Sequence, residues 1–184
     1  MAAVETAYTP LGFRAPEFKL CNTITGEMLS LAEVQSEIAT VVMFICNHCP
    51  YVVHVKDELV KLANDYIPEG ISFIAISSND VINYPQDSPE KMKDMALQSK
   101  FPFPYLYDEN QEVAKAYFAE CTPDYSIFGK DLNCVYRGQL DGSRPSNDVP
   151  VSGIDIRNAL DSILANRPIT KKQIPSLGCS IKWK

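Results

Sequence analysis

This 184-residue chain has no long apolar run and no net positive charge, and it has only two histidines. No apolar run approaches the roughly 18 residues that a membrane-spanning helix requires, so we expect no membrane partner. The net charge of −6 argues against nucleic acid as a main partner. The first residues, MAAVETAYTPLGFRAPEF, contain neither a basic nor an apolar leader region. We therefore expect no secretory signal and a cytoplasmic location.

Cysteine is also sparse, with six residues in the whole chain. This number is too small for a secreted scaffold held together by disulfides. In a reducing compartment most of these thiols would stay reduced. Two cysteines separated by two residues then indicate a catalytic or a metal-binding site.

The composition predicts a single domain spanning residues 1–184. The chain is 46% hydrophobic and 22% charged, as is typical of a folded protein with a core. Within it we expect an N-terminal loop over residues 1–17 and a basic C-terminal tail over residues 167–184. The tail has five basic residues and no acidic one, so charge could draw it onto the acidic remainder or leave it trailing.

The order of apolar patterns predicts an α/β fold. Continuous apolar runs at 38–45 and 71–78 are typical of strands buried on both faces. Helical spacing predicts a helix over 50–66 that begins at a proline, with further helices at 88–99, 110–119 and 153–165. A hairpin is expected within 17–31, an extended segment at 102–108 and a second hairpin at 124–138. This order predicts a mixed central sheet with helices on both sides.

One motif carries the chemistry, the stretch Cys46-Asn47-His48-Cys49 between a buried strand and a helix. A helix N-terminus stabilises a thiolate, which is the form of cysteine that attacks a disulfide. We expect Cys46 to be the exposed nucleophile and Cys49, one turn into the helix, to be the shielded resolving thiol. His48 beside Cys46 would favour the thiolate further and make the disulfide more oxidising.

Four segments together resemble a known family. They are GFRAPEFKL with GEMLSL, MFICNHCPYV, CTPDYSIFGKDLNCVYRGQLDG and GCSIKWK, and they span nearly the whole chain. The chain resembles the thioredoxin superfamily in its alkyl hydroperoxide reductase/thiol-specific antioxidant (AhpC/TSA) branch, most of all the peroxiredoxin-like proteins with a CxxC motif. This resemblance implies a thioredoxin-like fold with an N-terminal β-hairpin and an insertion after the second core strand.

The resemblance also implies roles for the segment Cys121-Thr122-Pro123. Pro123 takes the place of the cis-proline that lies opposite the active-site cysteines. Thr122 would offer its backbone to an extended substrate. Cys121 would then lie near Cys46, as a third redox thiol, as a metal ligand or as a small buried residue.

Departures from the family patterns limit these implications. Thioredoxin has Trp before the first cysteine and Gly-Pro between the two, whereas this chain has Ile45 and Asn47-His48. Peroxiredoxins carry a hydroxyl residue three positions before the reactive cysteine, but here Met43 and Cys46 stand three positions before Cys46 and Cys49. These differences disfavour both generic thioredoxin targets and peroxidase chemistry.

Three functions therefore compete. The leading one is a thiol–disulfide oxidoreductase with a redox-active Cys46–Cys49 disulfide and no other cofactor. Its partners would be a disulfide-containing protein or a small thiol, and an external reductant such as a thioredoxin system or glutathione. The second is a peroxiredoxin-like peroxide reductase. The third is a thiolate-based site for zinc or copper, although the leading hypothesis has no metal.

Overall fold

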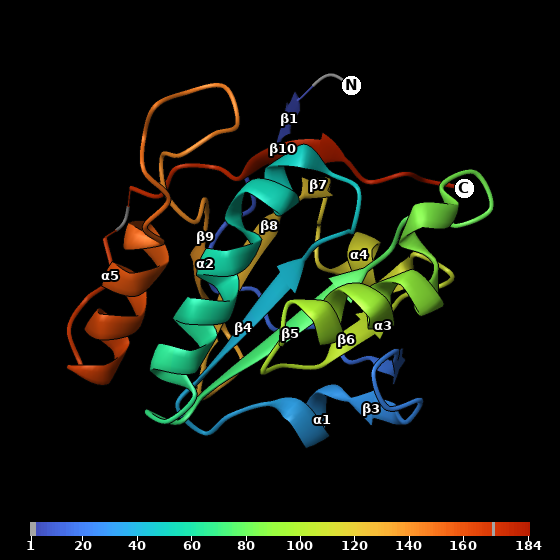
Figure 1. Ribbon diagram of the computed structural model, residues 1–184. Helices are drawn as coiled ribbons and strands as arrows, with labels where there is room; N and C mark the ends of the chain where they lie inside the picture. Colours follow the sequence, from blue (N-terminus) through green and yellow to red (C-terminus); the bar gives the residue numbers. More distant parts are fainter. Residues whose placement is uncertain (1–2, 171) are drawn as a thin grey trace.

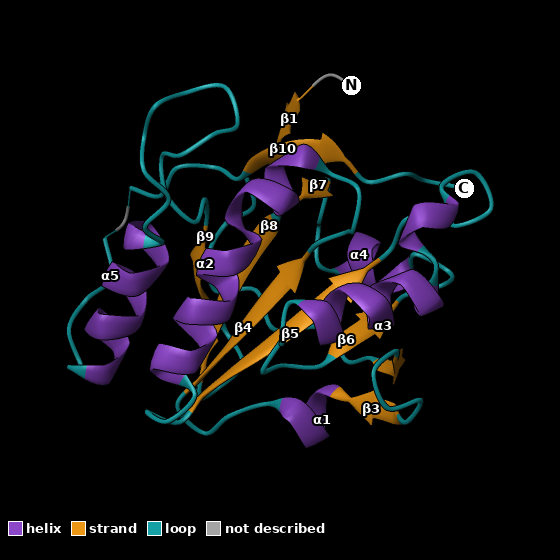
Figure 2. Cartoon of the chain, viewed as in Figure 1, coloured by secondary structure: helices purple, strands orange, loops and turns teal. Residues whose placement is uncertain are grey.

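The computed structural model describes residues 3–170 and 172–184, and its sheet is mixed as predicted (Figures 1 and 2). Seven strands lie in the order β3-β2-β6-β5-β4-β8-β9. Strands β4, β5 and β6 run parallel, and the other neighbouring pairs are antiparallel. The bounds are β2 Lys19–Asn22, β3 Met28–Ser30, β4 Ala39–Phe44, β5 Ile71–Ser77, β6 Tyr105–Tyr107, β8 Asp124–Gly129 and β9 Cys134–Arg137.

Helices cover both faces of this sheet. The helices are α1 Leu31–Val34, α2 Pro50–Tyr66, α3 Pro89–Gln98, α4 Glu112–Ala116 and α5 Ile154–Leu164, and η1 Pro85–Asp87 is a short 3₁₀ turn. Alternate residues of β4 enter two cores, because successive strand side chains point to opposite faces. Val41 and Met43 pack with α2, α3 and α5, whereas Val42 and Phe44 pack with α1 and α4. Among the described residues, no helix is long and apolar enough to cross a bilayer.

The predicted core elements agree with the structure to within a few residues, and two details were wrong. The helix predicted at 110–119 is shorter than expected, and Phe118, which follows it, is 49% exposed. That helix ends at Ala116, and Phe118 has a left-handed backbone conformation that turns its side chain away from the core. The loop predicted over 1–17 contains a strand, β1 Ala3–Glu5, while its residues 1–2 lie outside the described part.

A second sheet joins three segments that are far apart in sequence. It has the order β1-β10-β7, where β7 is Cys121–Thr122 and β10 is Leu177–Ser180. The basic tail is therefore packed on the domain in its described part, and β10 crosses above the first turn of α2 (Figure 1). Backbone hydrogen bonds hold it, including Ile181 N–H to the Glu120 carbonyl at 2.9 Å and Asp80 N–H to the Lys182 carbonyl at 2.8 Å.

Gly178 is required where β10 meets β7. A Cβ atom at this position would overlap the carbonyl oxygen of Thr122 and lie 3.0 Å from the nitrogen of Pro123. Both obstacles are backbone atoms, which cannot rotate away as a side chain can. Only glycine allows the strand to approach the Thr122–Pro123 segment this closely.

We expect Gly178→Ala to lower the free energy of unfolding by about 1–3 kcal/mol, because the added methyl group overpacks this contact. Urea unfolding followed by circular dichroism measures the change. Gly142→Ala is the matched control, since its Cβ would meet only Val149, in ordinary contact at 3.9 Å. Equal stability of the two variants would show that β10 can move off β7 at no cost.

Candidate active site

The two cysteines of the motif lie side by side at the start of α2, beside the segment Thr122-Pro123. β4 ends at Phe44, and the chain then passes through Ile45 and Cys46 to Cys49, which is the residue that precedes the first turn of α2. Cys49 was expected one turn into the helix, but Pro50 has no N–H group and occupies the first helical position. Both thiols are free.

Thr122 contacts both sulfur atoms. Its hydroxyl oxygen lies 3.2 Å from Cys46 Sγ, and its carbonyl oxygen accepts a hydrogen bond from Cys49 Sγ at 3.1 Å. The Thr122–Pro123 peptide bond is cis, the isomer that the resemblance implies. Cys46 is only 1% exposed, so the expectation of an exposed nucleophile was wrong for this conformation. Its thiol is enclosed between the strand β7 and the loop that follows β4.

The backbone of Thr122 is already paired with another strand. Cys179 of β10 lies directly opposite Thr122 in an antiparallel register. The expected role of Thr122, offering its backbone to an extended substrate, therefore conflicts with this arrangement on the β10 side. A substrate strand could pair there only after β10 had moved away.

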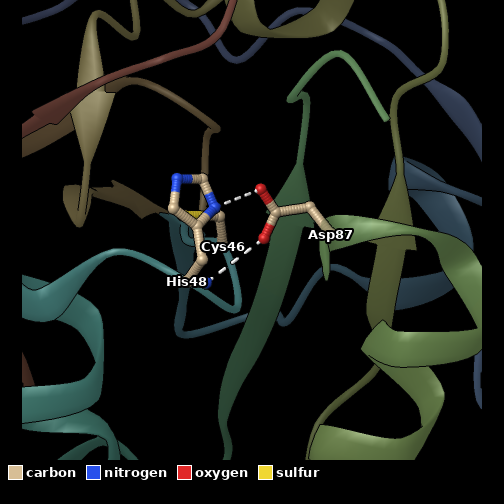
Figure 3. Close-up of side chains that lie close together, drawn as sticks. All are labelled: Cys46, His48 and Asp87. Atoms are coloured by element: carbon tan, nitrogen blue, oxygen red, sulfur yellow. Dashed lines mark hydrogen bonds and ion pairs between the residues drawn. The ribbon is translucent and has the colours of Figure 1, made fainter. Parts of the chain in front are cut away.

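Asp87 is the functional residue that sequence reasoning missed. It is fully buried at the end of η1, and its carboxylate accepts hydrogen bonds from the N–H groups of Asn47 (2.8 Å) and His48 (3.2 Å). It also lies 2.6 Å from His48 Nδ1 (Figure 3) and accepts a bond from Asn79 Nδ2 at 2.8 Å. These four bonds use the acceptor positions of the carboxylate and hold the CxxC loop in place.

The feature that could have identified Asp87 from the sequence is its position after a strand that lies next to β4. It ends the polar segment 79–87, which follows β5, and β5 is the parallel neighbour of β4. The carboxyl ends of two neighbouring parallel strands meet at one edge of the sheet, so their following loops lie close together. The segment itself contains no apolar pattern, so no local signal marks it as part of a site.

Asn47 and His48 position the loop. Asn47 Nδ2 donates to the Gln86 carbonyl at 3.0 Å, and its Oδ1 accepts a bond from the Tyr105 hydroxyl at 3.3 Å. The His48 ring stacks on Tyr84, with centroids 5.6 Å apart and an angle of 11°. His48 Nε2 is buried and has no partner within the described residues. Asp87 thus fixes the orientation of the His48 ring.

The two thiols of the motif titrate as a coupled pair because they share a hydrogen bond. The bond from Cys46 lowers the pKa of Cys49 to about 5. The same bond, together with burial and the negative charge of Asp87, raises the pKa of Cys46 well above its ordinary value. The first proton is therefore lost by the pair as a whole: these effects favour the charge on Cys49, whereas the Thr122 carbonyl, which accepts a hydrogen bond from Cys49 Sγ, favours a proton there.

The contacts of Thr122 show how this charge can reach Cys46. When the shared proton moves from Cys46 to Cys49, the Thr122 carbonyl accepts the new S–H bond. The Thr122 hydroxyl can then donate to the thiolate on Cys46. Hydrogen bonds to a charged group stabilise it, so this arrangement prepares Cys46 for attack without an external base.

Cys121 is turned away from the pair. Its Sγ lies 3.3 Å from the Thr6 hydroxyl and 3.6 Å from the Pro123 carbonyl oxygen, on the opposite face of β7 from Thr122. Burial raises the pKa of its thiol. The structure therefore brings Cys46, Asn47, His48, Cys49, Thr122 and Pro123 together and leaves Cys121 outside the group.

A metal would compete with existing bonds at this site. Cys46, His48 and Asp87 each place one possible ligand atom within 4.8 Å of the others. The Asp87 oxygens already accept four hydrogen bonds, and one of these comes from the His48 ring. A cation that used both residues would have to replace the bond between them, so the donor set present is better suited to holding the loop.

Comparisons with known proteins place the chain among redox proteins of one superfamily. The model of the AhpC/TSA family matches residues 11–137. No curated protein matches the chain. A solved structure of an uncharacterized conserved protein from Geobacillus kaustophilus is 62% identical over 100% of this chain and 97% of its own, with a TM-score of 0.98.

Two further structures show how far the similarity extends. A hypothetical protein from Sinorhizobium meliloti 1021 is 39% identical over 98% of each chain, with a TM-score of 0.95. A thiol:disulfide interchange protein of the thioredoxin family from Chlorobium tepidum TLS is 15% identical over 85% of this chain and 99% of its own, with a TM-score of 0.64. The last similarity concerns the fold alone, and it confirms the predicted thioredoxin-like fold.

We predict that Cys49→Ser removes the acidic titration of the site. In the reduced wild-type protein, absorbance of the thiolate at 240 nm should rise with an apparent pKa of about 5. In the variant, burial and Asp87 should hold the pKa of Cys46 above the ordinary thiol value of about 8.5. Cys121→Ser is the control and should titrate as wild type. An acidic transition retained in Cys49→Ser would place the charge on Cys46 instead.

Asp87→Asn should lower the free energy of unfolding by about 1.5–3 kcal/mol, because hydrogen bonds to a buried charge are lost. An amide side chain cannot accept from the N–H groups and also from both His48 and Asn79. Thermal and urea unfolding measure the difference. Asp94→Asn, at an exposed position beside Lys91, should change stability by less than about 0.5 kcal/mol. Two variants of equal stability would contradict the role given to the Asp87 carboxylate.

Proposed function

The chain belongs to the AhpC/TSA family, and on that premise we propose that it is a thiol–disulfide oxidoreductase that uses Cys46 and Cys49. The observation that carries the proposal is the pair of free thiols that both contact Thr122, next to the cis Thr122–Pro123 bond. Two thiols in contact can form a disulfide with little movement, and one low apparent pKa supplies the thiolate that exchange requires.

In this reaction Cys46 attacks a disulfide of the substrate. The shared proton moves to Cys49, the Cys46 thiolate displaces one substrate thiolate, and a mixed disulfide forms. Cys49 then attacks Cys46 Sγ and releases the second substrate thiol, leaving the Cys46–Cys49 disulfide. An external reductant in the cytoplasm, a thioredoxin system or glutathione, would return the pair to the reduced state.

The structure favours a small disulfide substrate over a folded protein. Cys46 is buried, and β10 occupies the edge of Thr122 where an extended chain would pair. A small disulfide such as oxidised glutathione needs less displacement of the surrounding chain. A protein substrate would require β10 to leave β7 first.

We expect oxidised glutathione to convert Cys46 and Cys49, and not Cys121, into an internal disulfide that dithiothreitol reverses. Labelling with a maleimide before and after oxidation, followed by peptide mapping, identifies the protected thiols. Titration in glutathione buffers then gives the midpoint potential, for which about −270 mV would indicate a reductase and −180 mV or above an oxidase or isomerase. Cys121→Ser serves as the control and should give the wild-type potential. If Cys46 and Cys49 never protect each other from the label, the proposal fails.

Peroxide reduction is a second candidate, and the Thr122 hydroxyl favours it. No hydroxyl residue lies three positions before either cysteine, but in space Thr122 Oγ1 approaches Cys46 Sγ to 3.2 Å. A hydroxyl at this distance could orient a peroxide as the peroxiredoxin hydroxyl does. Consumption of hydrogen peroxide that is lost in both Cys46→Ser and Thr122→Val would support this candidate over disulfide exchange alone.

A further inference from the structure

A third thiol, Cys179, lies beside the cysteine pair although 130 residues separate it from Cys49 in the chain. It is 4% exposed and belongs to the same buried cluster as Cys46 and Cys49. Cys121, which the sequence suggested for a third thiol, belongs to neither buried cluster. The position of Cys179 is fixed by β10, which Gly178 allows to approach Thr122 so closely.

The register of β10 directs the side chain of Cys179 toward the pair. Residues that lie directly opposite each other in antiparallel strands project to the same face of the sheet. Cys179 is opposite Thr122, whose side chain reaches Cys46. Ser180 is opposite Cys121, whose side chain lies on the other face against Thr6. Cys179 therefore faces the CxxC motif, and its thiol lies close enough to that of Cys49 for each to shift the pKa of the other.

We infer that Cys179 is a third redox thiol of this site, which exchanges with the Cys46–Cys49 disulfide by forming a disulfide with Cys49. The inference rests on the proposed function, because that reaction supplies the Cys46–Cys49 disulfide. It assigns Cys49 two partners, Cys46 on the substrate side and Cys179 on the side of the C-terminal segment.

The step is an internal thiol–disulfide exchange and needs no further oxidant. The Cys179 sulfur attacks Cys49 Sγ, the bond between Cys46 and Cys49 breaks, and a bond between Cys49 and Cys179 forms. The proton of the Cys179 thiol ends on Cys46, so the site still contains one disulfide and one thiol. The disulfide no longer includes Cys46, so its thiol becomes free to attack a second substrate.

The environment of Cys179 keeps its thiol protonated until the Cys46–Cys49 disulfide has formed. Burial and the hydrogen bond to Cys49 raise the pKa of Cys179 to about 12. Cys179 is therefore protonated in the reduced protein, where its thiol lies beside that of Cys49. It can become a nucleophile only after Cys49 has lost its negative charge by forming a disulfide with Cys46.

Tryptic peptides distinguish the two disulfides. Cys46 and Cys49 lie in one peptide, residues 20–56, so a bond between them links no second peptide. Cys179 lies in the peptide of residues 173–182. Mass spectrometry of protein that is oxidised with diamide, blocked with a maleimide and digested without reduction detects the linked pair of peptides.

Cys46→Ser isolates the second bond. With Cys46 absent, we expect Cys49 and Cys179 to form the internal disulfide, so that peptides 20–56 and 173–182 become linked. The link should disappear in Cys46→Ser/Cys179→Ser and persist in Cys46→Ser/Cys121→Ser and Cys46→Ser/Cys21→Ser. Circular dichroism confirms that each variant is folded. The same linked peptides are also sought in the oxidised wild-type protein, so the test does not rely on a variant alone.

Two results overturn the inference. In one, folded Cys46→Ser leaves both Cys49 and Cys179 open to the label under conditions that fully oxidise wild type. In the other, the linked peptides appear in neither protein. Absence of the Cys46–Cys49 disulfide from wild type is a separate result that rejects the proposed function, whether or not Cys49 and Cys179 become linked.

Discussion

One buried carboxylate determines the conformation of the loop that carries both cysteines. Asp87 has no exposed surface, and a buried charge is costly unless hydrogen bonds replace the water that it has lost. The N–H groups of Asn47 and His48 provide two of these bonds, so the loop between β4 and α2 must fold around the carboxylate. Because η1 carries Asp87, the insertion after β5 is part of the active site and not a surface addition. The same carboxylate disfavours a thiolate on Cys46 and so contributes to placing the charge on Cys49.

The C-terminal segment closes the site from the other side. β10 pairs with β7 next to Pro123, and the residues after it are held by Asn79 and Gln111, which follow different strands of the main sheet. The attachment does not rest on the positive charge of the tail, because among the described residues Lys182 and Lys184 form hydrogen bonds to neutral groups. A segment held by backbone pairing is insensitive to salt, unlike one held by exposed charges. Access to Cys46 therefore depends on the local stability of β10.

The sequence predicted the elements whose pattern is local. The continuous apolar run of β4 and the helical spacing and initial proline of α2 can each be recognised within a few residues, and together they placed Cys46 and Cys49 at the start of a helix. β1, β7 and β10 are two to four residues long and obtain their hydrogen bonds only from distant segments, so no local pattern marks them. Asp87 and Cys179 escaped prediction for the same reason, since each reaches the site through pairing between remote parts of the chain. The exposure expected for Cys46 was wrong because burial by β7 and its neighbours is also a long-range effect.

The distribution of charge among the thiols connects this geometry to the direction of the reaction. A more stable thiolate stabilises the reduced form and makes the disulfide more oxidising. When Cys49 carries the charge, the neighbouring thiols of Cys46 and Cys179 stabilise it. Formation of a disulfide between Cys49 and either partner removes the charge and the stabilising effect of both thiols at once. The two partners thus compete for one sulfur atom. If one thiol stabilises the Cys49 thiolate more strongly, the disulfide between Cys49 and the other thiol becomes easier to reduce.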